Sequence, residues 1–132
     1  IILMNEVPPV VESVTRLIDQ SRVNSYADAA RDHNPLHLDT PEARAGQFGR
    51  PVAHGMLILA IVSEMMSNTF GLQWAEQGHL KVRWRAPTFP PVTVISNAIL
   101  KEDIDGIASY EIFCEDEDGQ KLLTGIARVK YI

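Results

Sequence analysis

The feature that most constrains this chain is an uninterrupted apolar run from Met56 to Val62. We predict a helix from about His54 to Phe70, and within it this run leaves no polar side toward solvent. A helix that is apolar on all sides is buried on all sides, so other parts of the chain must wrap around it. The run is too short to cross a bilayer, which needs about 20 apolar residues. We therefore expect a buried central helix and no membrane partner.

The second half of the chain is predicted to supply the wrapping as four strands. Residues 80–85 alternate Leu80, Val82 and Trp84 with basic side chains, and this period of two indicates one buried and one wet face. The later strands are expected at 92–101, 107–115 and 121–131. Asp105-Gly106 and Asp118-Gly119 are expected to form the turns between them. Consecutive hairpins of this kind give an antiparallel meander.

The first half is predicted to be mostly helical. A strand is expected over 10–19 and a helix over about 22–31 with Ser21 as its N-cap. Pro35 removes a backbone donor and disfavours helix at the residue before it, which predicts a fixed turn from Asp32 to His37. Thr40 is expected to cap a short helix, and 46–51 to form a loop. Helices followed by strands indicate a single α+β domain over 1–132, an antiparallel sheet wrapped around one long buried helix, known as the hot-dog fold.

Charge and cysteine content exclude several function classes. The formal net charge is −5, whereas nucleic acid and anionic membranes both require a basic face. Cys114 is the single cysteine, so an internal disulfide and a cysteine zinc cluster are excluded. The apolar start, residues 1–4, is too short for a signal peptide and lacks a basic flank. We expect a cytoplasmic protein.

Acid–base chemistry is predicted for the turn. Asp32 and His37 lie five residues apart on a segment that Pro35 stiffens, so both side chains can point to one place. A carboxylate beside an imidazole can hold one water and move its protons near neutral pH. The side-chain amide of Asn34 is expected to fix the turn.

A second cluster, from Pro51 to Met56, precedes the apolar run. Gly55 is expected at the start of the central helix, where the first N–H groups have no partner within the helix and negative charge is favoured. Because glycine has no side chain, a ligand can approach its backbone closely. This is a predicted site for a developing oxyanion.

A metal site is the alternative for these residues. His37 and Asp39 with His54 offer two imidazoles and a carboxylate, and His33 and His37 are four residues apart. Pro35 breaks any helix that would align the second pair, and an iron site of the first kind is usual in all-β barrels. We therefore expect no metal ion.

The two clusters together resemble the signature of MaoC-like, (R)-specific enoyl-thioester hydratases. That signature is Asp, a variable residue, Asn-Pro, an apolar residue and His, and, after a spacer, a hydrophobic residue and His-Gly-Met. Residues 32–37 and 53–56 match both parts in order. Residues 88–91, Thr-Phe-Pro-Pro, depart from the family's Gly-Asp turn and are expected to change the rim of the substrate tunnel.

The resemblance implies a hydro-lyase that adds water to 2-enoyl thioesters of coenzyme A or acyl carrier protein, or removes it from (R)-3-hydroxyacyl thioesters, without a cofactor. It implies that Asp32 and His37 are the catalytic pair and that the Gly55 N–H polarises the thioester carbonyl. Substrate contacts are expected from Asn34, His54, Met56 and Ser63. For His54, a structural hydrogen bond to the catalytic loop is the favoured interpretation.

Two other functions stay open at this point. One is a hot-dog acyl thioesterase, and the other is a non-catalytic acyl-binding subunit of a dehydratase complex. An exposed sheet edge is usually paired or covered, so we expect a homodimer or a higher homo-oligomer.

Overall fold

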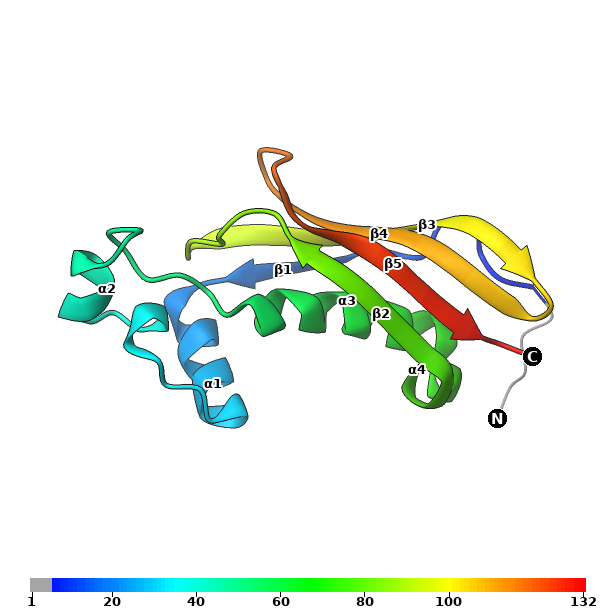
Figure 1. Ribbon diagram of the computed structural model, residues 1–132, viewed down its shortest axis with the longest axis horizontal. Helices are drawn as coiled ribbons and strands as arrows, with labels where there is room; N and C mark the ends of the chain where they lie inside the picture. The colour runs from blue at the N-terminus through cyan, green and yellow to red at the C-terminus, as the bar shows by residue number, and fades with distance from the viewer. Residues whose placement is uncertain (1–5) are drawn as a thin grey trace.

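One antiparallel sheet arches over one long helix in the computed structural model, which describes residues 6–132 (Figure 1). The expectation for residues 1–4 lies outside the described residues. The elements are β1 Val14–Ile18, α1 Gln20–Ala30, the 3-10 turn Pro35–His37, α2 Pro41–Ala45, α3 Gly55–Phe70, α4 Leu72–Gln77, β2 Gly78–Trp84, β3 Val92–Ile104, β4 Ile107–Asp116 and β5 Lys121–Lys130. The α+β hot-dog architecture predicted from the sequence is confirmed.

The five strands pair in the order β1-β3-β4-β5-β2, with every pair antiparallel. The predicted meander is β3-β4-β5. Asp105 and Gly106 both have positive φ, 54° and 77°, as a type I′ turn requires. At the second hairpin only Gly119 has positive φ, and the Asp116 carboxylate instead accepts from the backbone N–H of Asp118 and Gln120. Strands β1 and β2 are the two edges of the sheet.

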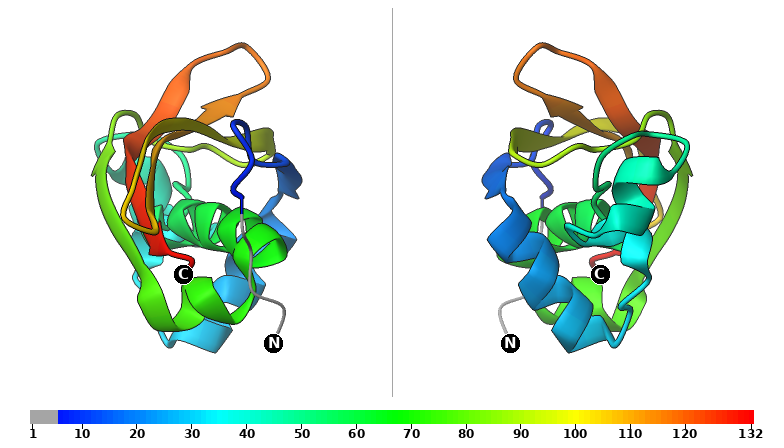
Figure 2. Two further views of the ribbon diagram at one scale, coloured as in Figure 1. Left: turned by 90° about the vertical axis from the view of Figure 1, so that its right-hand side faces the viewer. Right: turned by 90° about the vertical axis from the view of Figure 1, so that its left-hand side faces the viewer.

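Helix α3 lies in the concave side of the sheet (Figures 1 and 2). Its inner face carries Ile58, Val62, Met65 and Met66, each at most 1% exposed. The helix is not buried on all sides, because Met56, at its first turn, is 53% exposed. The sheet covers one side of the helix only, so the expectation of complete burial was too strong. Within residues 6–132, no helix has the length and apolar character needed to cross a membrane.

The boundaries in the first half differ from the prediction. Strand β1 is shorter than 10–19, and α1 begins at Gln20 with Asp19 as its N-cap, whose carboxylate accepts from the Arg22 N–H at 2.8 Å. The prediction of Ser21 as cap was therefore wrong by two residues. Helix α4 was not predicted; it follows Gly71, whose positive φ of 56° turns the chain back toward β2.

Candidate active site

The loop after α1 has a fixed backbone. Arg31 adopts the left-handed conformation with φ 55° and ends the helix, and the next N–H, of Asp32, donates to the Ala27 carbonyl at 3.0 Å. The Asn34 side-chain oxygen then accepts from the Leu36 N–H at 3.1 Å and caps the short 3-10 turn that Pro35 begins. The expected role of Asn34 in fixing this turn is confirmed.

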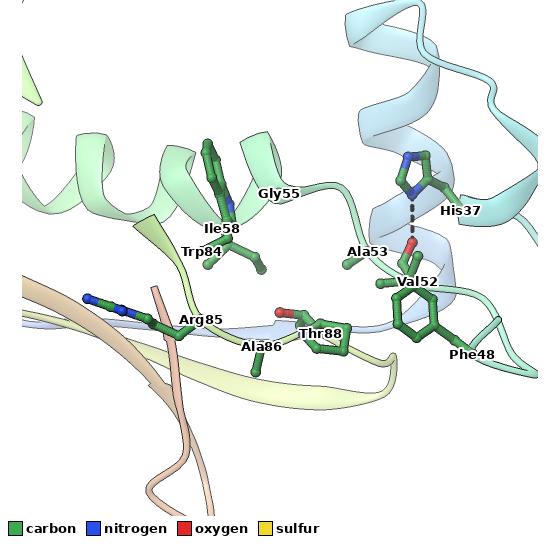
Figure 3. Close-up of a pocket in the computed structure, with 11 residues that line it drawn as sticks. His37, Phe48, Val52, Ala53, Gly55, Ile58, Trp84, Arg85, Ala86 and Thr88 are labelled. Carbon is green, nitrogen blue, oxygen red and sulfur yellow. Dashed lines mark hydrogen bonds between the residues drawn. The ribbon is translucent and has the colours of Figure 1, made fainter. Parts of the chain in front are cut away.

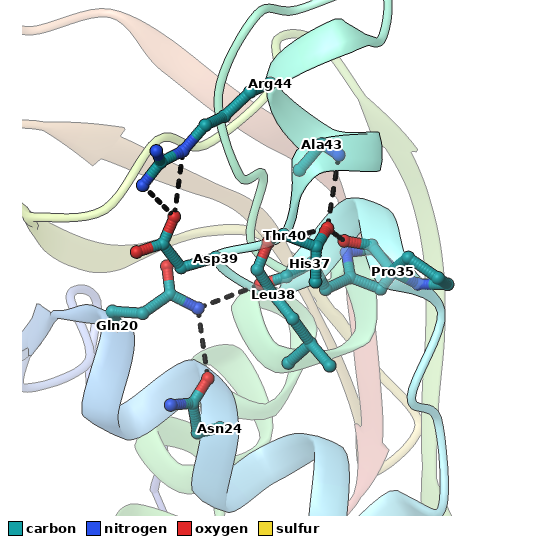
Figure 4. Close-up of polar contacts among 9 residues, drawn as sticks. All are labelled: Gln20, Asn24, Pro35, His37, Leu38, Asp39, Thr40, Ala43 and Arg44. Carbon is teal, nitrogen blue, oxygen red and sulfur yellow. Dashed lines mark hydrogen bonds and ion pairs between the residues drawn. The ribbon is translucent and has the colours of Figure 1, made fainter.

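Hydrogen bonds from both sides also hold the end of the turn in place (Figure 4). Gln20 on α1 donates to the His37 carbonyl at 2.9 Å, and the Thr40 hydroxyl donates to the Pro35 carbonyl at 2.7 Å. Thr40 also caps α2, as predicted, by accepting from the Ala43 N–H. The position of the His37 side chain is thus set by the loop backbone.

The His37 ring has a defined tautomer when neutral. Its Nδ1 lies 2.7 Å from the Val52 carbonyl oxygen. Since a carbonyl oxygen can only accept, Nδ1 must carry the proton. This leaves the Nε2 lone pair free, which is the state that a general base requires.

His54 connects this loop to the start of α3. Its ring is 2% exposed and stacks on His37 with centroids 3.8 Å apart and an interplanar angle of 27°. Its Nε2 donates to the Asp32 carbonyl oxygen at 3.0 Å, so the predicted hydrogen bond from His54 to the catalytic loop is confirmed. Tyr26 on α1 packs on the ring at 4.9 Å. His54 therefore supports both predicted catalytic residues.

The structure brings Asp32, His37 and His54 together, with one polar side-chain atom of each lying within 4.8 Å of the others. The Asp32 side chain is half exposed. An imidazole binds a metal ion along a lone pair in its own ring plane. Because the His37 and His54 rings stack face to face, their lone pairs do not meet at one ion. The arrangement suits a carboxylate and an imidazole that share a water.

The other residues considered for a metal site point elsewhere. Asp39 accepts two hydrogen bonds from Arg44, the shorter at 2.6 Å (Figure 4). His33 pairs through Nε2 with the Asp28 carboxylate at 2.8 Å. These contacts hold Asp39 and His33 outside the cluster.

A cavity of about 400 Å³ opens beside His37 (Figure 3). This volume lies in the range of small-molecule pockets. Its lining consists of the predicted His37 and Gly55 together with Phe48, Val52, Ala53, Ile58, Trp84, Arg85, Ala86, Pro87 and Thr88. The cavity therefore links the imidazole to the first residue of the central helix.

Gly55 is the first residue of α3, and its N–H donates to no protein acceptor within residues 6–132. The indole of Trp84 packs against this glycine, so that a Cβ at position 55 would lie 2.6 Å from Trp84 Nε1. The close approach of the indole therefore requires glycine at position 55. Trp84 itself is 49% exposed, which corrects the expectation that its side chain is buried with those of Leu80 and Val82.

Sequence reasoning missed Trp84 and Thr88 as lining residues of this cavity. Thr88 is 3% exposed, and its carbonyl accepts from the Ala53 N–H at 2.8 Å, which ties the strand exit to the segment before α3. The signal for Thr88 was its place in the unusual 88–91 segment. The signal for Trp84 was its position at the end of the predicted strand over residues 80–85.

None of the four predicted substrate contacts, Asn34, His54, Met56 and Ser63, is among the residues that line the cavity. Asn34 caps the turn, and Met56 faces outward on α3. The Ser63 hydroxyl accepts from the Trp74 indole N–H at 3.0 Å. Two of the four still contact Asp32: the Asn34 N–H donates to the Asp32 carboxylate at 3.4 Å, and His54 Nε2 donates to the Asp32 carbonyl at 3.0 Å.

The rim of the cavity joins the 46–51 loop to the 88–91 segment. Phe48 meets Phe89 edge to face at 5.7 Å, and the Arg50 guanidinium lies 4.7 Å from the Phe89 ring centre. Arg50 also donates to the Pro90 carbonyl at 3.3 Å. The unusual 88–91 segment thus packs against the 46–51 loop at the rim, and its first residue, Thr88, lines the cavity.

Comparison with protein families matches residues 6–111 to the MaoC like domain. The (R)-specific enoyl-CoA hydratase of Aeromonas caviae is 39% identical over 117 residues, which cover 83% of this chain and 84% of that protein. The 3-hydroxyacyl-thioester dehydratase Z of Mycobacterium tuberculosis is 36% identical over 74 residues, or 53% of this chain. That match spans about half (49%) of the dehydratase's own length.

Solved structures share the fold. The unliganded R-hydratase PhaJ1 of Pseudomonas aeruginosa superposes with a TM-score of 0.81 at 21% identity, covering 96% of this chain and 81% of that one. The ChsH1-ChsH2 complex of Mycobacterium tuberculosis contains a chain with a TM-score of 0.80 at 18% identity, covering 98% and 100%. At these identities the likeness shows the architecture alone.

Proposed function

Because this chain belongs to the MaoC-like domain family, we propose that it hydrates 2-enoyl thioesters to (R)-3-hydroxyacyl thioesters, or runs the reverse dehydration. The observation that carries the proposal is the His37 ring beside Asp32: its Nδ1 is committed to the Val52 carbonyl, and the residue lines a cavity that also reaches Gly55. The named relatives are hydratases and dehydratases of acyl thioesters, which agrees with this chemistry.

In the proposed reaction, Asp32 and His37 hold one water between them. His37 Nε2 accepts a proton from that water while the water oxygen forms a bond to C3 of the enoyl group. The electron pair of the C2–C3 double bond moves toward the thioester carbonyl, whose oxygen becomes negative. A proton then returns from the pair to C2, so that one water has been added in full. The Asp32 carboxylate orients the water and stabilises the imidazolium that forms.

The negative charge on the carbonyl oxygen requires a donor that is in place before the reaction starts. The Gly55 N–H at the start of α3 is such a donor, and the helix dipole favours negative charge there. The missing side chain makes room for the Trp84 indole beside this N–H, since a Cβ here would lie 2.6 Å from Trp84 Nε1. Because the thioester itself takes up the electron pair, the mechanism needs no cofactor.

The test is a hydration assay on crotonyl-CoA. We expect loss of the enoyl absorbance, formation of 3-hydroxybutyryl-CoA and, on chiral analysis, the (R) product. The thioesterase alternative predicts release of free thiol from the same substrate, which a thiol reagent detects. The acyl-binding-subunit alternative predicts binding of crotonyl-CoA without turnover of either kind. Either of those results would replace the proposed reaction.

Coenzyme A and acyl carrier protein thioesters are both proposed substrates, because relatives act on each: one is named an enoyl-CoA hydratase and another a mitochondrial 3-hydroxyacyl-[acyl-carrier-protein] dehydratase. Turnover of crotonyl groups on the two carriers, compared as kcat/KM, separates them. The carrier with the larger value is the preferred substrate.

We also propose that the chain works as a homodimer or higher homo-oligomer. Its sheet has two open edges, β1 and β2, and exposed strand edges are usually paired or covered. The exposed Met56 and Trp84 lie near the β2 edge and the start of α3. Sedimentation equilibrium should give a mass of at least two chains, and a monomer at micromolar concentration would contradict this.

A further inference from the structure

Trp84 occupies a fixed place beside the site that the proposed function assigns to the thioester carbonyl. It is the last residue of β2 and pairs with Leu123 on β5. The next residue, Arg85, donates its N–H to the Leu122 carbonyl at 2.8 Å and its Nε–H to the Thr124 hydroxyl at 2.7 Å. The backbone that carries the indole is therefore held by three consecutive residues of β5.

The nitrogen edge of the indole is the part that faces Gly55. A Cβ built on Gly55 would meet Trp84 Nε1 at 2.6 Å, Cε2 at 2.9 Å and Cδ1 at 3.2 Å, and the nitrogen is the nearest of these atoms. Both residues line the same cavity, and Figure 3 shows the indole standing beside the start of the helix. An oxygen atom lodged against the Gly55 backbone thus lies next to an indole N–H.

That indole N–H is available to a ligand. Within residues 6–132 it donates to no protein acceptor, whereas the indole N–H of Trp74, the second tryptophan of the chain, donates to Ser63 at 3.0 Å. The tryptophan nitrogen is a donor only. It can therefore donate to a carbonyl oxygen but cannot accept a hydrogen bond from the other donors to that oxygen.

We propose that Trp84 is a substrate-binding residue whose indole N–H is a second hydrogen-bond donor to the thioester carbonyl oxygen, alongside the Gly55 N–H. The inference rests on the proposed function for the place of that carbonyl. A carbonyl oxygen has two lone pairs, and oxyanion sites commonly combine a backbone N–H with a side-chain donor. The rigid indole needs no reorganisation as negative charge develops on the oxygen.

The test reads the carbonyl directly and does not depend on turnover. Butyryl-CoA labelled with ¹³C at the carbonyl has no double bond to hydrate, so its isotope-edited infrared band can be measured on the bound thioester. We expect the wild-type protein to shift this band to lower frequency than in water. Trp84→Phe keeps an aromatic wall without the N–H and should lose a clear part of the shift. Trp74→Phe, the matched control, should keep the whole shift.

Hydration kinetics provide the second readout. If crotonyl-CoA is a substrate, Trp84→Phe should lower kcat about 10²-fold with a smaller change in KM, because the donor acts most strongly on the developing oxyanion. A protein that does not hydrate crotonyl-CoA but shifts the butyryl carbonyl band through Trp84 would refute the proposed reaction and leave this inference standing.

A measurement on the wild-type protein covers the case in which Trp84→Phe fails to fold. With two tryptophans, the ¹⁵N-labelled protein has two indole N–H resonances, and Trp74→Phe assigns them. Butyryl-CoA should move the Trp84 resonance downfield and leave that of Trp74 in place. An unmoved Trp84 resonance, an infrared shift equal in Trp84→Phe and wild type, or no binding of butyryl-CoA would each overturn the inference.

Discussion

The contact between Gly55 and Trp84 makes a quantitative prediction about packing. Carbon and nitrogen atoms in favourable contact lie about 3.5–4.0 Å apart. In Gly55→Ala the new methyl group would lie 2.6 Å from Trp84 Nε1 and 2.9 Å from Cε2, so the indole or the start of α3 must move.

The magnitude follows from two opposed effects. Inserting a methyl group into occupied space costs about 1–3 kcal/mol. Alanine favours the helix over glycine by up to about 1 kcal/mol. Gly55→Ala should therefore destabilise the wild-type protein by up to about 3 kcal/mol. In a Trp84→Ala background the overlap is absent, and the same change should be neutral or stabilising.

The assay is a double-mutant cycle on the free energy of unfolding, from urea titrations followed by circular dichroism. All four proteins are compared at one protein concentration, because stability of an oligomer depends on it. The cycle should give a coupling free energy of about 1–3 kcal/mol between positions 55 and 84. Equal effects of Gly55→Ala in both backgrounds would refute the packing on which the carbonyl site depends.

Three further predictions concern the catalytic loop and the core. Asp32→Asn and His37→Ala should each lower kcat by about 10²–10⁴-fold with unchanged circular dichroism, whereas His33→Ala, on the same loop but paired with Asp28, should retain the wild-type rate. His54→Phe keeps the ring stack but loses the donor to the Asp32 carbonyl, so urea titration should show a loss of about 1–2 kcal/mol and kcat should fall. Burial raises the pKa of the Cys114 thiol from 9.0 to about 12, so as pH rises the unfolded chain releases the thiol proton before the folded chain does. The stability that the protonated thiol gives the folded state is therefore complete below pH 9 and is lost between pH 9 and 12. In Cys114→Ala, the decline of unfolding free energy over that range should be shallower by up to about 1.4 kcal/mol per pH unit, and an unchanged slope would contradict the assignment.

The sequence predicted the elements that local chemistry determines. Pro35 and Asn34 specify the turn, and Asp105-Gly106 adopts the positive φ angles that its residue types favour. The alternation in residues 80–85 correctly indicated a strand. Each of these signals lies within a few consecutive residues, so no tertiary information was needed to interpret them.

Other features depend on contacts between distant segments. The alternating pattern of β2 predicts which of its side chains face the core. Its last residue, Trp84, departs from that pattern, because the side chain lies against the start of α3 and is half exposed. The stack of His37 on His54 joins residues from two loops, and the sequence predicted the hydrogen bond of His54 without the stack. The α1 cap was misplaced because Asp19 and Ser21 are both good N-caps, and the end of β1 selects the first.

The most direct test of the account is the rate of crotonyl-CoA hydration by the double variant Asp32→Asn/His37→Ala, measured with both single variants and the wild type. Two groups that serve one shared water lose their function together, so the double variant should be about as slow as the slower single variant. Losses that multiply, or a double variant close to the wild-type rate, would contradict a shared water between these two side chains.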